Sequence, residues 1–107
     1  MNEDDVFNAL ADATRRRMLD RLIDMQGQTL NELVANLDMR RQSATRHLNV
    51  LEQAGLIVVH WHGREKRHYL NPVPIAEIQR RWIDKFSSAK VMALAELKLK
   101  LDLEEGN

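Results

Sequence analysis

Cysteine is absent from the 107-residue chain, and the two prolines, four glycines and 5% aromatic residues are few. The lack of cysteine excludes disulfides, thiolate metal ligands and thiol nucleophiles. A signal peptide and a long uncharged apolar run are also lacking, so neither secretion nor membrane spanning is indicated, and we expect a cytoplasmic protein. The length predicts one small domain over residues 1–107, for which self-association is an expected extra source of stability.

The charge is balanced overall but unevenly distributed along the chain. Basic and acidic residues number 16 each, so the net charge is zero. Between positions 39 and 69, six basic residues accompany two acidic ones, a net of +4, whereas the first twelve residues hold four acids and no base. A neutral chain with one positive segment is typical of proteins that bind nucleic acid through one face.

Residues 39–56 are the most informative segment. Ala44, Leu48, Leu51 and Ala54 recur at spacings of three and four, which predicts an amphipathic helix that Gly55 ends. Side chains that bond phosphates and base edges crowd its N-terminal half. These candidate DNA-binding residues are Arg40, Arg41, Gln42, Ser43, Thr45, Arg46 and His47. The pattern predicts the reading helix of a helix-turn-helix; the alternative is a solvated basic face on an ordinary surface helix.

Three shorter helices are predicted before this one. The first spans residues 4–11, and Asp12 is a good N-cap for a second over residues 13–25. The apolar residues Met18, Leu19, Leu22, Ile23 and Met25 of the second helix are expected to point inward, and its arginines, Arg15, Arg16, Arg17 and Arg21, mostly outward. A capping box, in which Thr29 and Glu32 each bond the other's backbone amide, opens a third helix that ends near Leu37, and residues 38–40 form the turn.

The period of the apolar residues changes after Gly55. Residues 57–62 are rich in β-branched and aromatic side chains, which predicts a strand. Gly63-Arg64 is typical of a turn, and residues 65–70 are expected to form the second, antiparallel strand. The segment therefore predicts a β-hairpin with a basic tip. Arg64, Lys66 and Arg67 are the DNA-binding candidates here, with a plain solvated hairpin as the alternative. Asn71 to Pro74 form a stiff connector, and Pro74 suits the first turn of a final helix.

The final helix is predicted over residues 74–103. One stripe of apolar residues would pack on the domain, but a second set lies off that stripe and needs another partner. In so small a protein, the simplest partner is a second copy of the chain. The alternation of apolar and polar residues over 97–103 would also permit a strand, but alanine, leucine, glutamate and lysine favour helix there.

This order of elements predicts a winged helix-turn-helix. The fold class is mainly α with a small β-hairpin wing, with residues 4–73 forming the helices, helix-turn-helix and wing and 74–103 a long C-terminal dimerisation helix. Residues 6–19 (VFNALADATRRRML), residues 44–56 (ATRHLNVLEQAGL) and Gly63-Arg64 followed by Tyr69-Leu70 resemble motifs of the ArsR-type bacterial transcriptional repressors. The resemblance covers residues 5 to about 86.

The resemblance implies a sequence-specific repressor that binds double-stranded promoter DNA as a homodimer on an inverted repeat. Gln42, Ser43, Thr45 and Arg46 would then project into the major groove, Arg40 and Arg41 would meet phosphates, and the wing would add backbone contacts. The first and last helices form the dimer interface in such relatives. The corresponding candidates in this sequence are Phe7, Leu10, Trp82, Phe86, Ala93 and Leu97.

Metal sensing through cysteine is not expected. Thr29 and Asn31 stand where the metal sensors of the family carry cysteines, and no histidine follows His68. His60 and His62 should share one strand face and His68 the opposite one, so three ligands do not converge and we expect neither metal nor cofactor. A histidine-based sensor and a winged-helix protein-interaction module remain the alternatives. No nucleophile–base pair or glycine-rich phosphate loop indicates an enzyme, and the operator, the regulated genes and any effector are left open.

Overall fold

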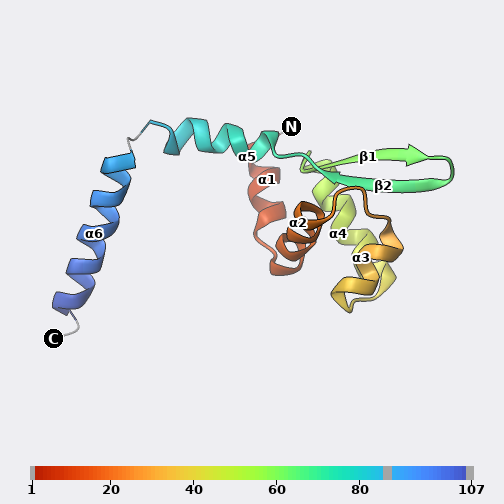
Figure 1. Ribbon diagram of the computed structural model, residues 1–107, viewed down its shortest axis with the longest axis horizontal. Coiled ribbons are helices and arrows are strands. Elements are labelled where there is room, and N and C mark those ends of the chain that lie inside the picture. The colour runs from red at the N-terminus through yellow and green to blue at the C-terminus, as the bar shows by residue number, and fades with distance from the viewer. Residues whose placement is uncertain (1, 86–87, 106–107) are drawn as a thin grey trace. The chain divides into compact units, whose positions relative to one another are not determined.

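The computed structural model describes residues 2–85 and 88–105 and divides the chain into two compact units, residues 1–75 and 76–107. The first unit contains α1 (Glu3–Leu10), α2 (Ala13–Asp24), α3 (Leu30–Leu37), α4 (Arg41–Gln53), β1 (Ile57–His62) and β2 (Glu65–Leu70) (Figure 1). The predicted fold class, a mainly helical winged helix-turn-helix, is confirmed. Among the described helices, none has the length and apolar character that crossing a bilayer requires.

The start of α2 follows the sequence prediction. The Asp12 side chain accepts a hydrogen bond from the Arg15 backbone N–H at 3.0 Å, which satisfies one of the free amides at the helix N-terminus. This bond, helped by the positive charge of Arg15, holds the pKa of the Asp12 carboxyl below its ordinary value of 3.8. The cap therefore stabilises α2 most when the carboxylate is ionised.

The core of the first unit is built from one apolar side of each helix and the start of β1. Met18, Leu22, Leu33, Leu51 and Leu56 are its largest fully buried side chains. Buried leucines contribute about 1.5–3 kcal/mol each by leaving water. The predicted stripe of α4 is confirmed, because Ala44, Leu48 and Leu51 are all buried.

Two apolar residues of the second predicted helix are not in this core. Ile23 and Met25, expected to point inward, are 60% and 62% exposed. Ile23 lies one position, about 100°, beyond the buried Leu22 on the helix surface. The helix ends at Asp24, and Met25 has extended backbone angles, so its side chain leaves the helical face. The prediction is therefore correct for Met18, Leu19 and Leu22, whereas Ile23 lies off the buried side of the helix and Met25 lies beyond its end.

The two-stranded hairpin is joined by an isolated bridge to the loop before α3. β1 and β2 pair antiparallel from Ile57↔Leu70 to His62↔Glu65, and Gln28 forms an isolated bridge with His68. The buried Gln28 amide donates to the carbonyls of Arg21 at 2.7 Å and Met25 at 2.8 Å, at the end of α2. The Gln28 side chain thus bonds the end of one helix, while its backbone carbonyl accepts from the His68 N–H of the wing at 2.9 Å.

The C-terminal helix differs from the continuous one predicted over residues 74–103. The structure has α5 (Val73–Ile78), a π-helical turn η1 (Gln79–Ile83) and then α6 (Ser88–Glu105). The Asp84 N–H bonds the Gln79 carbonyl five residues back, at 2.9 Å, so the α-helical ladder has already widened there. Asp84 and Ser88 are residue types that favour helix ends over helix interiors, which the alanine and leucine content obscured.

We predict that the Asp12 cap gives the protein a specific sensitivity to acid. Because the folded-state pKa is lowered, the stabilisation is complete above the ordinary pKa and is lost as the pH falls through the lowered one. Asp12→Asn keeps a capping side chain that does not titrate, so its free energy of unfolding should fall less on acidification, measured by urea unfolding at fixed protein concentration. The control is Asp20→Asn, in the middle of the same helix; equal acid losses in both variants would contradict the assignment.

Candidate nucleic-acid interface

The helix-turn-helix is formed by α3, a three-residue turn and α4. Thr29 caps α3 by accepting from the Glu32 N–H at 3.3 Å, as predicted, but its hydroxyl also donates to the Glu32 carboxylate at 3.1 Å, in place of the predicted carboxylate bond to the Thr29 amide. In the turn, Asp38 is in the left-handed region with φ 47°, the one such non-glycine residue in the described part of the chain. Aspartate tolerates this conformation better than most residues, which allows the chain to reverse into α4.

The side of α4 opposite its buried stripe presents the predicted polar residues. Arg40, Gln42 and Arg46 are exposed, and Ser43 is half-buried. Within residues 2–85 and 88–105, the side chains of Arg40, Gln42 and Arg46 have no hydrogen-bond or ion-pair partner. Arg40, the N-cap residue, makes no side-chain cap, so the first amides of α4 also lack a side-chain acceptor. An arrangement of free donors at a helix N-terminus suits contact with phosphates and base edges.

Two further candidates on α4 already have partners. The Arg41 guanidinium donates to the Asn31 side-chain carbonyl at the start of α3, and the Thr45 hydroxyl donates to the Arg41 carbonyl at 2.9 Å. Both side chains are nevertheless exposed. These bonds hold Arg41 beside α3 and keep the Thr45 methyl group available for contact.

Arg15 joins three helices, although the sequence placed it mostly on the outside. It is half-buried, and its guanidinium donates to the carbonyls of Asn8 at 2.9 Å and Ala9 at 2.8 Å, at the end of α1. Its third contact is with His47 Nδ1 on α4, at 3.3 Å. An arginine has only donors, so Nδ1 accepts and neutral His47 carries its proton on Nε2. His47, half-buried, therefore positions α4 and also leaves Nε2–H as a donor.

The three basic candidates of the hairpin have different surroundings. Arg64 follows Gly63 in the turn, is exposed and has no partner in the described residues. Lys66 lies 3.7 Å from the Glu52 carboxylate of α4. Arg67 pairs with Glu65 at 2.8 Å and reaches the Gly27 carbonyl at 3.5 Å, with its Nε buried. Arg64 is thus the wing cation most available to a phosphate, whereas Arg67 is held against the loop before α3.

A groove of about 380 Å³ lies between α4, the start of α3 and the inner face of the hairpin. Its lining includes Arg41, Thr45 and Asn49 from the helices and Trp61 and Lys66 from the hairpin. Trp61 is 60% exposed there, and sequence reasoning did not select it. The signal was available, since Trp61 alternates with His60 and His62 on a strand and must face the opposite way.

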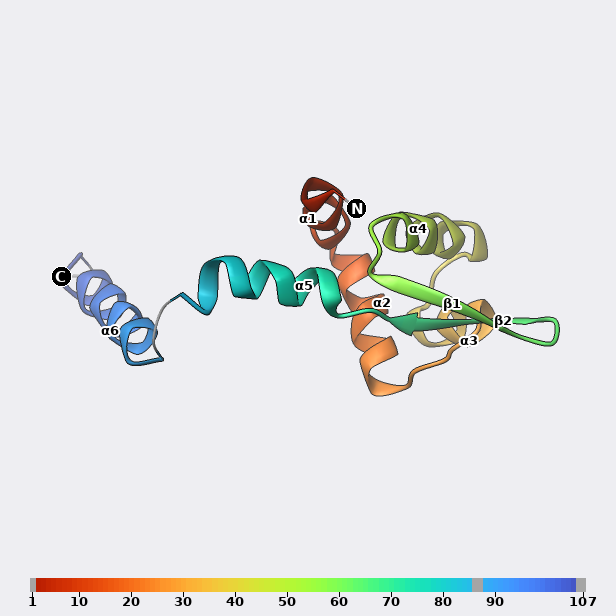
Figure 2. The ribbon, with the colours of Figure 1, turned by 90° about the horizontal axis from the view of Figure 1, so that it is seen from above.

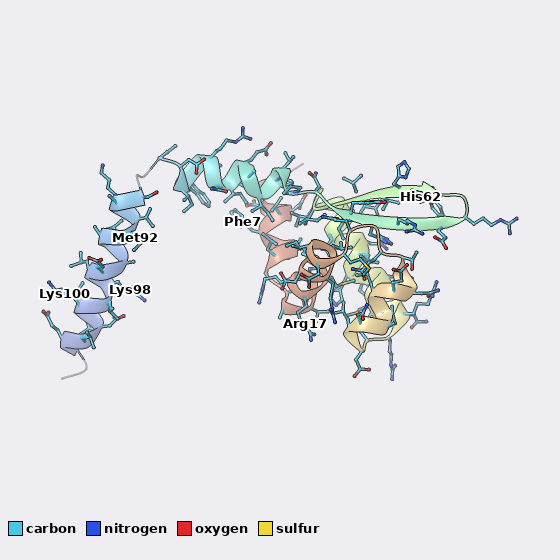
Figure 3. All side chains as sticks on the ribbon, in the orientation of Figure 1. Phe7, Arg17, His62, Met92, Lys98 and Lys100 are labelled. Carbon is cyan, nitrogen blue, oxygen red and sulfur yellow. The ribbon has the colours of Figure 1, made fainter. Side chains whose placement is uncertain are left out.

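The histidines of the hairpin lie as predicted. His60 and His62 share the outer face of β1, whereas His68 is buried on the inner face and its Nδ1–H donates to the Gln28 carbonyl at 2.8 Å. Figure 3 labels His62 on the hairpin. Over the described residues, no three or more histidine, cysteine or acidic side chains come together as a metal-binding group.

The dimer-interface candidates lie in both units. In the first unit, Phe7 on α1 is 39% exposed and Leu10 is half-buried. In the second unit, Trp82 is 46% and Leu97 52% exposed, Ala93 is exposed, and the Arg81 guanidinium lies 5.5 Å from the Trp82 ring centre. The remaining candidate, Phe86, lies outside the described residues.

Comparison with known proteins gives consistent matches. The helix-turn-helix domain family matches residues 10–60. The chain is 36% identical over 89 residues to YuzN, an uncharacterised HTH-type transcriptional regulator of Bacillus subtilis (strain 168), covering 78% of this chain and 97% of YuzN. It is 35% identical over 66 residues to the transcriptional repressor SdpR of the same organism, covering 62% of this chain and 72% of SdpR.

Solved structures agree with these matches. An ArsR-like transcriptional regulator from Rhodococcus sp. RHA1 superimposes with a TM-score of 0.69 at 29% identity, over 91% of this chain and 90% of that one. A homodimeric winged helix-turn-helix DNA-binding domain from Mycobacterium bovis superimposes with a TM-score of 0.62 at 20% identity, over 87% and 77% of the two chains, which supports the fold alone.

We predict that the two hairpin arginines contribute differently to stability. Arg67→Ala should lower the free energy of unfolding by about 1 kcal/mol, because it removes an ion pair and a hydrogen bond to the loop before α3. Arg64→Ala, the matched control, should change it by less than about 0.5 kcal/mol because its side chain has no partner to lose. Urea unfolding of both variants at equal protein concentration measures the difference; equal stabilities, or a larger loss for Arg64→Ala, would show that Arg67 is not held as described.

Proposed function

We propose that this chain, which belongs to the ArsR-type family of winged helix-turn-helix transcriptional regulators, is a cytoplasmic repressor that acts as a homodimer on an inverted-repeat operator. It is a transcriptional regulator with a DNA-binding helix-turn-helix. Repression would follow from covering promoter DNA, with no catalytic step. SdpR, described as a transcriptional repressor, supports the negative direction of control.

The exposed polar side of α4 is the observation that carries this proposal. The burial of Ala44, Leu48 and Leu51 leaves Gln42, Thr45 and Arg46 on the outside, and α4 is oriented by its packing against the rest of the first unit. In the major groove, glutamine pairs with adenine and arginine with guanine through two hydrogen bonds, each worth about 1–3 kcal/mol of discrimination. We assign base reading to Gln42, Ser43, Thr45 and Arg46.

The remaining candidates would position the protein on the backbone. Arg40, at the N-cap of α4, and Arg41 and the His47 Nε2–H, on α4, would meet the phosphates that flank the groove. The hairpin projects beyond α3 and α4 in both views of the ribbon (Figures 1 and 2), which suits a second contact along the same duplex. There Arg64 would make the principal phosphate contact, with Lys66 and Arg67 adding charge. Trp61 would cover a sugar or base edge from the groove beside α4.

A homodimer is supported by the character of α6. Within its own unit, α6 buries none of its residues. Residues two apart on a helix differ by about 200°, so Leu97 and Leu101 lie on one side and Leu99 and Leu103 on the other. Figure 3 shows Met92, Lys98 and Lys100 along the same helix. Apolar side chains that the rest of their unit leaves exposed are expected to pack against a partner. The commonest such partner is a second copy of the chain related by two-fold symmetry.

We predict that Arg46→Ala separates specific from non-specific binding. Loss of a two-bond base contact should weaken binding to promoter DNA roughly 5- to 150-fold, with a smaller effect on unrelated duplex. Fluorescence anisotropy against DNA from upstream of the chain's own gene, over a series of salt concentrations, measures both affinities. Arg17→Ala removes the same charge from α2 and is the matched control (Figure 3). Specific affinity that survives Arg46→Ala, or falls equally in Arg17→Ala, would argue against reading by α4 and favour the interaction module.

We predict that Leu97→Asp weakens self-association. An unpaired carboxylate placed in an apolar contact is costly, so the dimer dissociation constant should rise by roughly tenfold or more, since each 1.4 kcal/mol is a factor of ten. Sedimentation equilibrium measures the constant, and Lys100→Ala, on the same helix, is the control. A dimer of unchanged strength in Leu97→Asp would remove this residue from the interface.

A further inference from the structure

We propose that His60 and His62 form a two-nitrogen chelating site for one divalent transition-metal ion on the outer face of the wing. The site goes beyond the proposed function, since neither residue lies on the reading helix. Cu(II) would bind more tightly than Ni(II) or Zn(II), because imidazole sites follow that order of affinity. Mg(II) and Ca(II), which prefer oxygen ligands, would not compete.

The geometry of the two rings is the first argument. Positions two apart on a strand point to the same face, and here His60 Nδ1 lies 3.1 Å from His62 Nε2. The ring centres are 4.8 Å apart with the planes inclined at 62°. Two nitrogens this close cannot both carry a proton that points at the other, so at least one presents a lone pair.

The separation also fits a metal ion. Metal–imidazole bonds of about 2.0–2.1 Å from both nitrogens across a 3.1 Å gap subtend an angle of about 95–100° at the metal. This value lies between the right angles of square-planar or octahedral coordination and the tetrahedral angle. Small rotations of two exposed rings about their side-chain bonds would bring both lone pairs onto one ion.

The charge of the neighbouring arginine is compensated, so it does not exclude a cation from this face. Arg67 lies opposite His60 in the register, but its charge is paired with Glu65, which lies opposite His62. The Tyr69 hydroxyl is 3.4 Å from His62 Nε2 and adds a polar oxygen at the same place. Since no third histidine or acidic side chain completes a preformed group among the residues described, water would fill the other coordination positions.

The test uses the intact chain and the metal salts alone. Calorimetric titration with CuCl₂ should give one site per chain, and electron paramagnetic resonance should report two nitrogen ligands. His60→Ala and His62→Ala should each weaken Cu(II) binding by at least about tenfold, the lower bound even for the loss of an outer-shell partner. Because both side chains are exposed, the unfolding curves of the metal-free variants should match that of the parent chain.

A histidine outside the pair supplies the matched control. His47→Ala removes an imidazole from α4 and should leave Cu(II) binding unchanged, whatever it does to DNA binding. Binding that persists in both wing variants, that falls in His47→Ala, or that depends on only one of the two wing histidines would overturn the chelate. In that case the pair is only a hydrogen bond between solvated side chains.

Discussion

The burial of one stripe of α4 is the constraint on which the interface depends. Ala44, Leu48 and Leu51 are buried, so the rotation of the helix about its axis is determined by the core. Emptying one of these positions would cost about 2–5 kcal/mol for a leucine, a large part of the stability of a domain this small. The same packing that stabilises the unit therefore selects which side chains of α4 face outward. The stability of the unit and the polar outward surface of α4 are two consequences of one helix orientation.

Contacts between residues far apart in the sequence also help to hold α4 and the wing in place. Arg15 joins the end of α1 to His47 on α4, and Gln28 joins the end of α2 to β2 of the wing. Each uses a single polar side chain to donate to backbone carbonyls at a helix end. Because these hydrogen bonds are part-buried, the loss of either side chain would leave a carbonyl without that partner and lower the stability of the unit. The end of α1 is thus connected to α4, and the end of α2 to the wing, through side chains that bond the helix ends.

The features that depend on neighbouring residues, such as helix starts, turns and periodicity, could be predicted from the sequence. Asp12, Thr29 and Gly63 marked a helix start or the hairpin turn, and the periodicities identified α4 and both strands. Local rules could not reveal the Arg15–His47 contact, 32 positions apart, or the pairing of Arg67 with the loop before α3. The π-helical turn at Gln79–Ile83 was also missed, because helix propensity does not report where a ladder widens. The outward polar set of α4 was predictable; which of its members already have partners was not.

Although the net charge of the chain is zero, its basic residues differ in whether they have partners within the fold. Arg15 and Arg67 have partners within the fold, whereas Arg40 at the N-cap of α4, Arg46 on α4 and Arg64 on the wing are exposed. We propose above that the outward side of α4 reads the DNA sequence. Selection of bound duplexes from a random-sequence pool tests this proposal directly, because it requires no chosen operator. We expect an inverted repeat with half-sites about one helical turn, 34–36 Å, apart, and its loss with Arg46→Ala; a pool that stays random in sequence would contradict the proposal.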